Sequence, residues 1–206
     1  MKKILLFVSI AIIFASCSSK SNFSLEVNIH NNNSLIDKQL VIVQSLDGNT
    51  VYTDTVKIKK NNFALHIPYE GPALVNISIL KSNIKDLLLA AEDGIVQLNI
   101  EGEKAFIGGT LLNDRLQAFY SESDSISSLF RELDRGIMQQ DTPQAYEEYR
   151  QKRSSLIKEN TDRIIAFIKE NIDNPVGEYY YMTNYIMYPP ERQSEMRSFA
   201  TEKLKK

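Results

Sequence analysis

The chain from residue 23 to about residue 107 alternates between apolar and polar side chains. In residues 23–30, FSLEVNIH, every odd-numbered residue up to Ile29 is apolar, which is typical of a strand that buries one face. Similar short runs follow at residues 39–46, 50–58, 63–67, 73–80, 87–91 and 95–100. Asp47-Gly48 between two of them favours a hairpin turn, because Gly tolerates a positive φ angle. The pattern predicts an antiparallel β-sandwich or barrel-like domain over residues 23–109.

The period changes near Leu111, where apolar residues begin to recur at alternating spacings of four and three. Such spacing places them on one stripe of a long helix. The stripe consists of Leu112, Leu116, Phe119, Ser123, Ile126, Phe130, Leu133 and Ile137, and Ser123 is its polar member. Thr142 and Pro143 then offer an N-cap and a first-turn proline, so we expect a second helix that ends near Asn171. Its inward residues should be Leu156, Ile157, Ile164, Phe167, Ile168 and Ile172.

Prolines divide the remainder of the chain. Asn174-Pro175 ends the second helical pattern, and Pro189-Pro190 separates two shorter helices expected around residues 177–188 and 191–204. Two long helices joined by a short turn should pair antiparallel. The predicted fold class is therefore α+β, with the β domain followed by a C-terminal helical hairpin and short terminal helices in residues 110–206.

The first residues have the features of an export signal. Lys2 and Lys3 precede an apolar run at residues 4–14, and small residues follow it. Eleven helical residues measure about 16 Å, whereas the hydrocarbon core of a bilayer is about 30 Å thick. The run is too short to span a membrane comfortably, and we interpret residues 1–16 as a lipoprotein signal peptide.

Cys17 is the one cysteine of the chain. The tetrapeptide Phe14-Ala15-Ser16-Cys17 resembles the bacterial lipobox, which implies cleavage before Cys17 and acylation of its thiol. Two or three acyl chains would anchor the protein stably, with residues 17–22 as a tether. The downstream residues lack an acidic cluster resembling surface-export signals, which favours an outer-membrane location facing the periplasm.

The charge of the chain argues against nucleic acid as a partner. The chain has 24 basic and 26 acidic residues, a formal net charge of −2, and no basic cluster. Binding to nucleic acid depends on neutralising a row of phosphates. The 43% of apolar residues is enough for a folded core.

Residue types associated with catalysis occur without the spacing that catalysis requires. His30 and His66 lie in separate strands, with no H-x-H or H-E-x-x-H pattern, so we predict neither a metal site nor a cofactor. There is no G-x-S-x-G elbow. The acidic pairs at Glu92-Asp93, Glu101 with Glu103, and Glu122 with Asp124 fall at a turn or at expected exposed positions, which does not favour acid catalysis.

The segment YYYMTNYIMY, residues 179–188, is the most unusual in the chain. Tyr181, Tyr185 and Tyr188 share a helical face that could contact a glycan, a peptide or a protein. The alternative is that this face packs on the helical hairpin, because an amphipathic helix must bury one side.

Two short segments suggest covalent sugar attachment. Asp54-Thr55-Val56 and Asp124-Ser125-Ile126 resemble the acidic O-glycosylation motif of some Bacteroidetes periplasmic proteins. The resemblance implies modification at Thr55 and Ser125.

The order of these features resembles a family of Bacteroidetes-type lipoproteins. Its members carry an N-terminal β domain of unknown function, commonly ahead of a thioredoxin-like (AhpC/TSA) domain. The residues that carry the resemblance are the strand 23–29, the Asp47-Gly48 turn, Asn62-Phe63-Ala64-Leu65, the segment 87–94, Gly108-Gly109-Thr110-Leu111-Leu112-Asn113 and Asn174-Pro175. This chain ends at Lys206, about where the thioredoxin-like domain would begin, and it has no C-x-x-C pair.

From these observations we expect a lipid-anchored envelope protein that acts as a binding or accessory module, not as an enzyme. Its expected partners are the membrane, through the lipid, and an envelope protein or glycan. Two alternatives stay open. The chain could be the β-domain half of a split thiol–disulfide exchange system, or an enzyme whose site is assembled from scattered polar residues.

Overall fold

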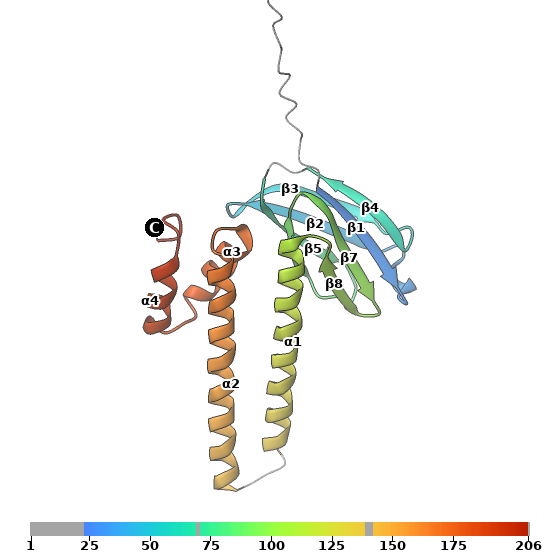
Figure 1. Cartoon of the computed structure of the whole chain (residues 1–206). Coiled ribbons are helices and arrows are strands. Elements are labelled where there is room, and N and C mark those ends of the chain that lie inside the picture. The colour runs from blue at the N-terminus through green and yellow to red at the C-terminus, as the bar shows by residue number, and fades with distance from the viewer. Residues whose placement is uncertain (1–22, 69–70, 139–141, 206) are drawn as a thin grey trace, which may run out of the picture.

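The computed structural model describes residues 23–68, 71–138 and 142–205, which form two β-sheets followed by four α-helices (Figure 1). The predicted signal peptide, the tether and Cys17 lie outside the described residues. The strands are β1 (Phe23–His30), β2 (Gln39–Leu46), β3 (Asn49–Lys57), β4 (Asn62–Ile67), β5 (Ala73–Ile79), β6 (Leu87–Ala91), β7 (Gly94–Glu101) and β8 (Lys104–Gly108). The helices are α1 (Leu111–Ile137), α2 (Pro143–Glu170), α3 (Pro175–Tyr185) and α4 (Pro190–Phe199), and a 3₁₀ turn covers Asn33–Leu35. The α+β class predicted from the sequence is confirmed.

Each sheet has four strands. Their orders are β4-β1-β7-β8 and β3-β2-β5-β6, and neighbouring strands are antiparallel except β1 and β7. In that parallel pair Phe23 lies opposite Gly94 and His30 lies opposite Glu101. The expectation of a purely antiparallel unit is therefore wrong at one pair, because a two-residue period shows which face is buried but not the direction of the neighbouring strand.

The alternation seen in the sequence becomes the alternation of burial. In β1 the odd-numbered residues are buried and the residues between them are half-buried. β2 and β3 form the predicted hairpin, in which Asp47 and Gly48 have φ angles of 51° and 78°. Positive φ at both central positions matches the twist of the two strands. The inner faces of both sheets join the N-terminal half of α1 in one hydrophobic core.

Helix α1 begins between the open edges of the two sheets, where it hydrogen-bonds to both edge strands. On the β6 side, Asn113 accepts a hydrogen bond from the Ala90 amide at 2.9 Å and donates one to the Ala90 carbonyl at 2.8 Å. Tyr120 donates to the Leu88 carbonyl of the same strand at 2.9 Å. On the β8 side, Gln117 accepts from the Ile107 amide at 2.8 Å. The helix thereby satisfies edge groups that would otherwise stay unpaired.

Helices α1 and α2 pair as an antiparallel hairpin that projects away from the sheets (Figure 1). Thr142 caps α2 by accepting a hydrogen bond from the Ala145 amide at 3.2 Å, as the sequence predicts. Ile157 is 44% exposed, so the prediction that it points inward is wrong. Both helices are described throughout, and their buried side chains all lie in the halves nearest the sheets.

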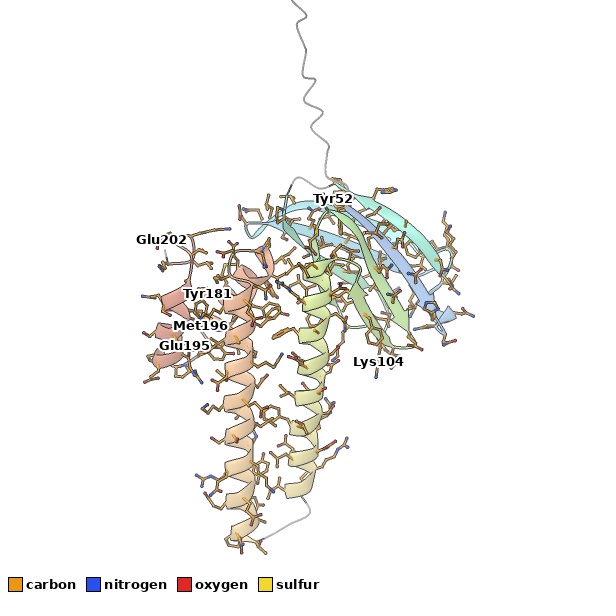
Figure 2. The ribbon with its side chains drawn as sticks, viewed as in Figure 1. Tyr52, Lys104, Tyr181, Glu195, Met196 and Glu202 are labelled. Carbon is orange, nitrogen blue, oxygen red and sulfur yellow. The ribbon has the colours of Figure 1, made fainter. Side chains whose placement is uncertain are left out.

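Helices α3 and α4 pack on α2 and build a second hydrophobic core. Asn174 starts α3 by accepting hydrogen bonds from the amides of Val176 and Gly177. The buried residues of this core are Ile165, Ile168, Ile172, Tyr181, Met196 and Ala200. Tyr181 and Met196 lie between α4 and the upper part of α2 (Figure 2). None of the helices in the described ranges is long and apolar enough to cross a membrane.

Candidate functional site

A groove of about 590 Å³ lies between α1 and α2, close to the sheets. It is lined by Arg115, Ala118, Phe119, Glu122, Arg163, Ala166, Phe167, Glu170 and Asn171. Ala118 and Ala166 leave room between the helices because their side chains are short. The groove is thus an opening in the hairpin's own seam.

Two aromatic rings line the groove, and a third packs against both. The rings of Phe119 and Phe167 are stacked, with centroids 4.0 Å apart, and Tyr180 of α3 meets both edge-on. Offset and edge-on aromatic contacts of this kind add stability beyond simple area burial. Burial raises the pKa of the Tyr180 phenol above its ordinary value. The groove therefore has an apolar aromatic lining whose rings are held in place by their contacts with one another.

Arg163 joins the two helices beside these rings. Its guanidinium lies 4.3 Å from the Phe119 ring centroid and donates to the Phe119 carbonyl at 3.3 Å. It also donates to Ser123 Oγ at 2.8 Å and contacts the Glu122 carboxylate at 3.4 Å. The polar interruption at Ser123 in the α1 stripe is therefore matched by a cation on α2. Arg163 Nε is buried and has no hydrogen-bond partner among the described residues.

Opposite charges face one another at several levels of the hairpin. Glu122 and Arg163 are in contact, while Arg115 and Glu170 line the same groove from opposite helices. Nearer the tip, a smaller hollow of about 190 Å³ has Glu132 on α1 and Lys152 on α2. Each hollow is therefore lined by charges of both signs.

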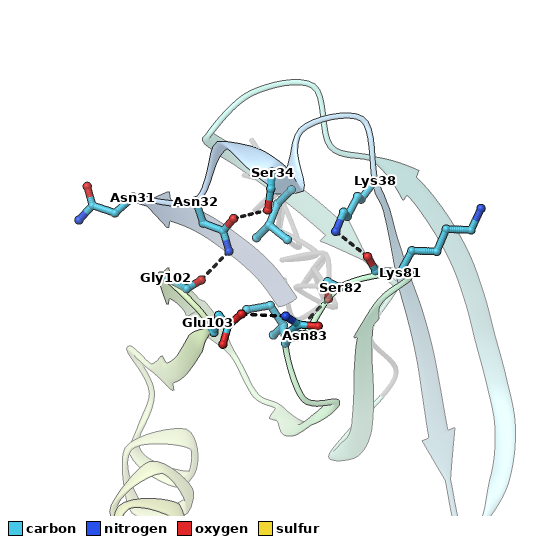
Figure 3. A pocket seen from close by; sticks show the side chains of 11 residues that line it. Asn31, Asn32, Ser34, Lys38, Lys81, Ser82, Asn83, Gly102 and Glu103 are labelled. Carbon is cyan, nitrogen blue, oxygen red and sulfur yellow. Dashed lines mark hydrogen bonds between the residues drawn. The ribbon is translucent and has the colours of Figure 1, made fainter.

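A second, polar pocket of about 240 Å³ lies at one end of the sandwich (Figure 3). Its polar side chains hydrogen-bond to backbone carbonyls and to one another across three loops. Asn32 donates to the Gly102 carbonyl at 2.5 Å, Asn83 donates to Glu103 at 2.8 Å, and Lys38 donates to the Lys81 carbonyl at 2.5 Å (Figure 3). The pocket is therefore the place where three loops meet and hydrogen-bond to one another.

Two segments that carry the family resemblance meet where α1 starts. Glu92 Oε2 accepts hydrogen bonds from the Thr110 hydroxyl at 2.5 Å and from the Leu112 amide at 3.0 Å, so it caps the helix. Gly109 has a φ angle of 89°, and a Cβ there would lie 2.5 Å from the Ile95 carbonyl oxygen. Asn113 ties the same turn to β6. These motif residues have a structural role.

Of the predicted contact tyrosines, Tyr181 and Tyr185 lie on the inner side of α3, whereas Tyr188 follows the end of this helix, so the three do not share one helical face. Tyr181 is 4% exposed and stacks on Tyr185 with ring centroids 5.3 Å apart. Tyr185 accepts a hydrogen bond from Arg197 of α4 at 2.7 Å, and Tyr188 is half-buried. The arrangement matches the alternative in which this face packs on the other helices. The exposed apolar residues of the segment are instead Tyr179, Met182, Ile186 and Met187.

The two sites with a resemblance to O-glycosylation motifs are both exposed. Thr55 lies on the edge strand β3, where its amide donates to Asp54 at 2.7 Å. Ser125 lies on α1, and its hydroxyl donates to the Ser121 carbonyl at 3.0 Å. Glycosylation at these residues stays a prediction.

The histidines lie apart from the groove. His66 of β4 is hydrogen-bonded through Nδ1 to Ser24 of β1 at 2.9 Å, and His30 is exposed at the end of β1. Within the described ranges, no group of three or more His, Cys, Asp or Glu side chains could hold a metal ion.

The family comparison bears on the β domain and the start of α1. Residues 23–116 match the family model described as Domain of unknown function (DUF4369). The DUF4369 segment thus includes both sheets and extends to Leu116, a fully buried residue of the joint core. A comparison with curated proteins and another with solved structures found no match.

The groove itself was missed by sequence reasoning. Ala118 and Ala166 are small residues on opposite helices, and only the register of the hairpin brings them together. One signal was available, because Ser123 interrupts an otherwise apolar stripe. A polar residue at such a position indicates a polar partner on the facing helix.

Proposed function

We propose that this protein is a lipid-anchored component of the bacterial envelope that works by binding through its helical hairpin, without catalysis. The observation that carries the binding part is the α1–α2 groove, with its aromatic lining and mixed charges. Apolar surface flanked by a few placed polar groups is the usual composition of a contact site.

The chemistry of the groove favours contact over reaction. Glu122 and Arg163 neutralise each other, and Arg163 is further held by Ser123 and the Phe119 carbonyl. A cation fixed in this way orients a bound group but has no proton to exchange near neutral pH, because an arginine stays protonated. The aromatic rings supply the apolar contact area.

The anchor is supported by the sequence around Cys17. Two lysines, a short apolar run and small residues converge on this one cysteine. An acyl chain contributes about 0.8 kcal/mol of membrane affinity per buried methylene, so two or three chains hold the protein stably. We place the protein at the outer membrane, facing the periplasm.

Detergent phase partition tests the anchor. The full chain is expressed with its own signal in a bacterium that has an outer membrane, and membranes are extracted with Triton X-114. The wild-type protein should enter the detergent phase, as should the control Ser18→Ala. Cys17→Ser should enter the aqueous phase or keep its uncleaved signal. A wild-type protein that enters the aqueous phase would exclude the lipid.

Site-specific photo-crosslinking in intact cells tests the groove. A benzoylphenylalanine at Ala166 should give a defined adduct, because this position lines the groove. The same group at Ala64, an exposed residue of β4, is the matched control and should give none. An empty result at Ala166, or identical adducts at both positions, would contradict binding through the hairpin.

A further inference from the structure

The two hollows between α1 and α2 lie on the same face of the hairpin. On α1, Arg115 and Glu122 line the upper hollow, and Gly136 lines the lower one. Glu122 follows Arg115 by seven residues and Gly136 follows Glu122 by fourteen, and positions seven residues apart return to nearly the same side of a helix. Leu129 falls midway in this series and is 50% exposed. The face is therefore one surface with an apolar residue near its centre.

The outer half of the hairpin buries its apolar residues only in part. On α1 no side chain beyond Phe119 is buried, although Phe130, Leu133 and Ile137 continue the apolar stripe. On α2, which is also described throughout, no side chain before Ile165 is buried. In a pair of helices, each helix covers only one side of the other. A further pair of helices packed on this face would cover the remaining apolar surface, as in a four-helix bundle.

The charged residues of α1 and α2 that border this face are complementary to those of a second copy of the same chain. Arg115 and Glu132 on α1 make no ion pair with any described residue, and the same is true of Glu170 and Lys152 on α2. These four residues give each helix both signs, in opposite order along the hairpin, while Glu148 of α2, which also lines the lower hollow, accepts a hydrogen bond from Gln144 at 3.4 Å. The pattern of one hairpin is therefore complementary to that of an identical hairpin.

We infer that the occupant of the groove is a second copy of this chain, packed hairpin to hairpin about a two-fold axis parallel to the helices. In this arrangement α1 of one copy lies against α2 of the other. Arg115 faces Glu170 of the partner copy and Glu132 faces its Lys152, so each pair forms twice. Ala118 and Ala166 allow the close approach. The surface on both copies is the same, as in other symmetric dimers.

The direction of the axis rests on the proposed lipid anchor. The first described residue, Phe23, lies near the start of α1. It pairs with Gly94, and a Cβ built on Gly94 would lie 3.7 Å from the Thr110 side chain. The hairpin tip is a helix length away, about 40 Å at 1.5 Å per residue. A parallel two-fold axis keeps both N-terminal ends on one side, where both lipids can enter one membrane. A perpendicular axis would place them at opposite ends.

A charge-exchange experiment on the full acylated protein tests the dimer. One variant carries Arg115→Glu with Glu132→Lys, and the second carries Glu170→Lys with Lys152→Glu, so net charge is unchanged in both. Each variant alone meets like charges in the dimer, and its dissociation constant should rise about tenfold or more. Mixed together, the two variants regain both sets of opposite pairs. Sedimentation equilibrium in excess density-matched micelles measures the association.

The inference requires three results together: a wild-type dimer, two weakened variants, and recovery of the dimer in the mixture. A monomeric wild-type protein, unaffected variants, or a mixture as weak as its components would overturn it. Such a failure is distinguishable from failure of the proposed function. The protein would still partition into detergent and still give an adduct at Ala166, but with another protein.

A spin label at Met138→Cys reports the orientation, because Met138 is 84% exposed at the hairpin tip and Cys17 carries the lipid. The parallel two-fold axis places the two tips side by side, within about two helix diameters or roughly 20 Å. A dominant distance near the helix length, about 40 Å, would show the perpendicular arrangement and overturn the one proposed.

Discussion

Arg163 of α2 donates a hydrogen bond of 2.8 Å to Ser123 of α1, across the seam of the hairpin. Ser123 is the polar member of an apolar stripe, and its hydroxyl in turn donates to the Phe119 carbonyl at 2.7 Å. This pair fixes the register of the two helices beside the stacked rings of Phe119 and Phe167. The groove depends on that register, since it brings Ala118 and Ala166 to the same level.

Replacing Arg163 with alanine should destabilise the protein. The substitution leaves Ser123 and Asn160 without the Arg163 donor and removes one of the donors to the Phe119 carbonyl, so a cost of about 2 kcal/mol in the free energy of unfolding is expected. The control is Arg150→Ala, which removes an exposed pair with Glu147 and should cost under about 0.5 kcal/mol. Urea unfolding followed by circular dichroism measures both. Equal losses would show that Arg163 does not join the helices.

Asn113 should be the most sensitive polar residue where α1 joins the β domain. It is fully buried and binds both backbone groups of Ala90, so Asn113→Ala leaves a buried amide and a buried carbonyl unpaired. The expected loss is about 2–4 kcal/mol in the free energy of unfolding. Asn76→Ala, at an exposed position of β5, should change it by no more than about 0.5 kcal/mol. A tolerated Asn113→Ala would contradict the role given to α1 at the sheet edge.

Two glycines should respond to alanine in opposite directions. A Cβ on Gly177 would lie 1.9 Å from the Asn171 carbonyl oxygen, whereas a Cβ on Gly136 would meet nothing within 4 Å. Gly136→Ala should therefore stabilise α1 by about 0.5–1 kcal/mol, through helix propensity. Gly177→Ala should lower the melting temperature, because the backbone must move apart. The two melting temperatures, compared with wild type, decide the point, and a stabilised Gly177→Ala would refute this close contact.

Stability should fall at alkaline pH through the half-buried Tyr120. Burial is the main cause that raises the pKa of Tyr120, whose hydroxyl donates to the Leu88 carbonyl. Its pKa in the folded state lies above the unfolded value of about 10, so the unfolded chain releases the proton first. This contribution is complete below pH 10 and declines as the pH rises beyond it. Tyr120→Phe should make the urea midpoint less dependent on pH between 9 and 11 (a range of about one unit on each side of that value), and an unchanged dependence would contradict the assignment.

The β domain was largely accessible to sequence reasoning, because local patterns determine most of its features. The two-residue period predicted strands at β1 to β7 but not at β8, and Asp47-Gly48 predicted the hairpin turn that the φ angles confirm. The parallel pairing of β1 with β7 was not accessible, since these strands are far apart in the chain and their periods carry no direction. The bonds from Asn113 to Ala90 depend in the same way on tertiary placement.

The helical region shows where periodicity overstates burial. The apolar stripe of α1 correctly predicted a long helix with one inner face, but its outer half faces a single helix and stays half-buried. Ile157 was placed inward by pattern and lies outward. Tyr181 shows the opposite case. The sequence leaves open whether its face is exposed or packed, and in the structure α4 covers it. In each case the missing information is the number of neighbouring helices.

Intact-mass spectrometry of the protein purified from bacterial membranes tests the lipid anchor most directly, and the anchor is the claim on which the account of membrane attachment rests. The account predicts a chain that begins at Cys17 and carries the added mass of a diacylglycerol group, with or without a further acyl chain. A chain that retains Met1, or one with a free Cys17 thiol, would contradict it.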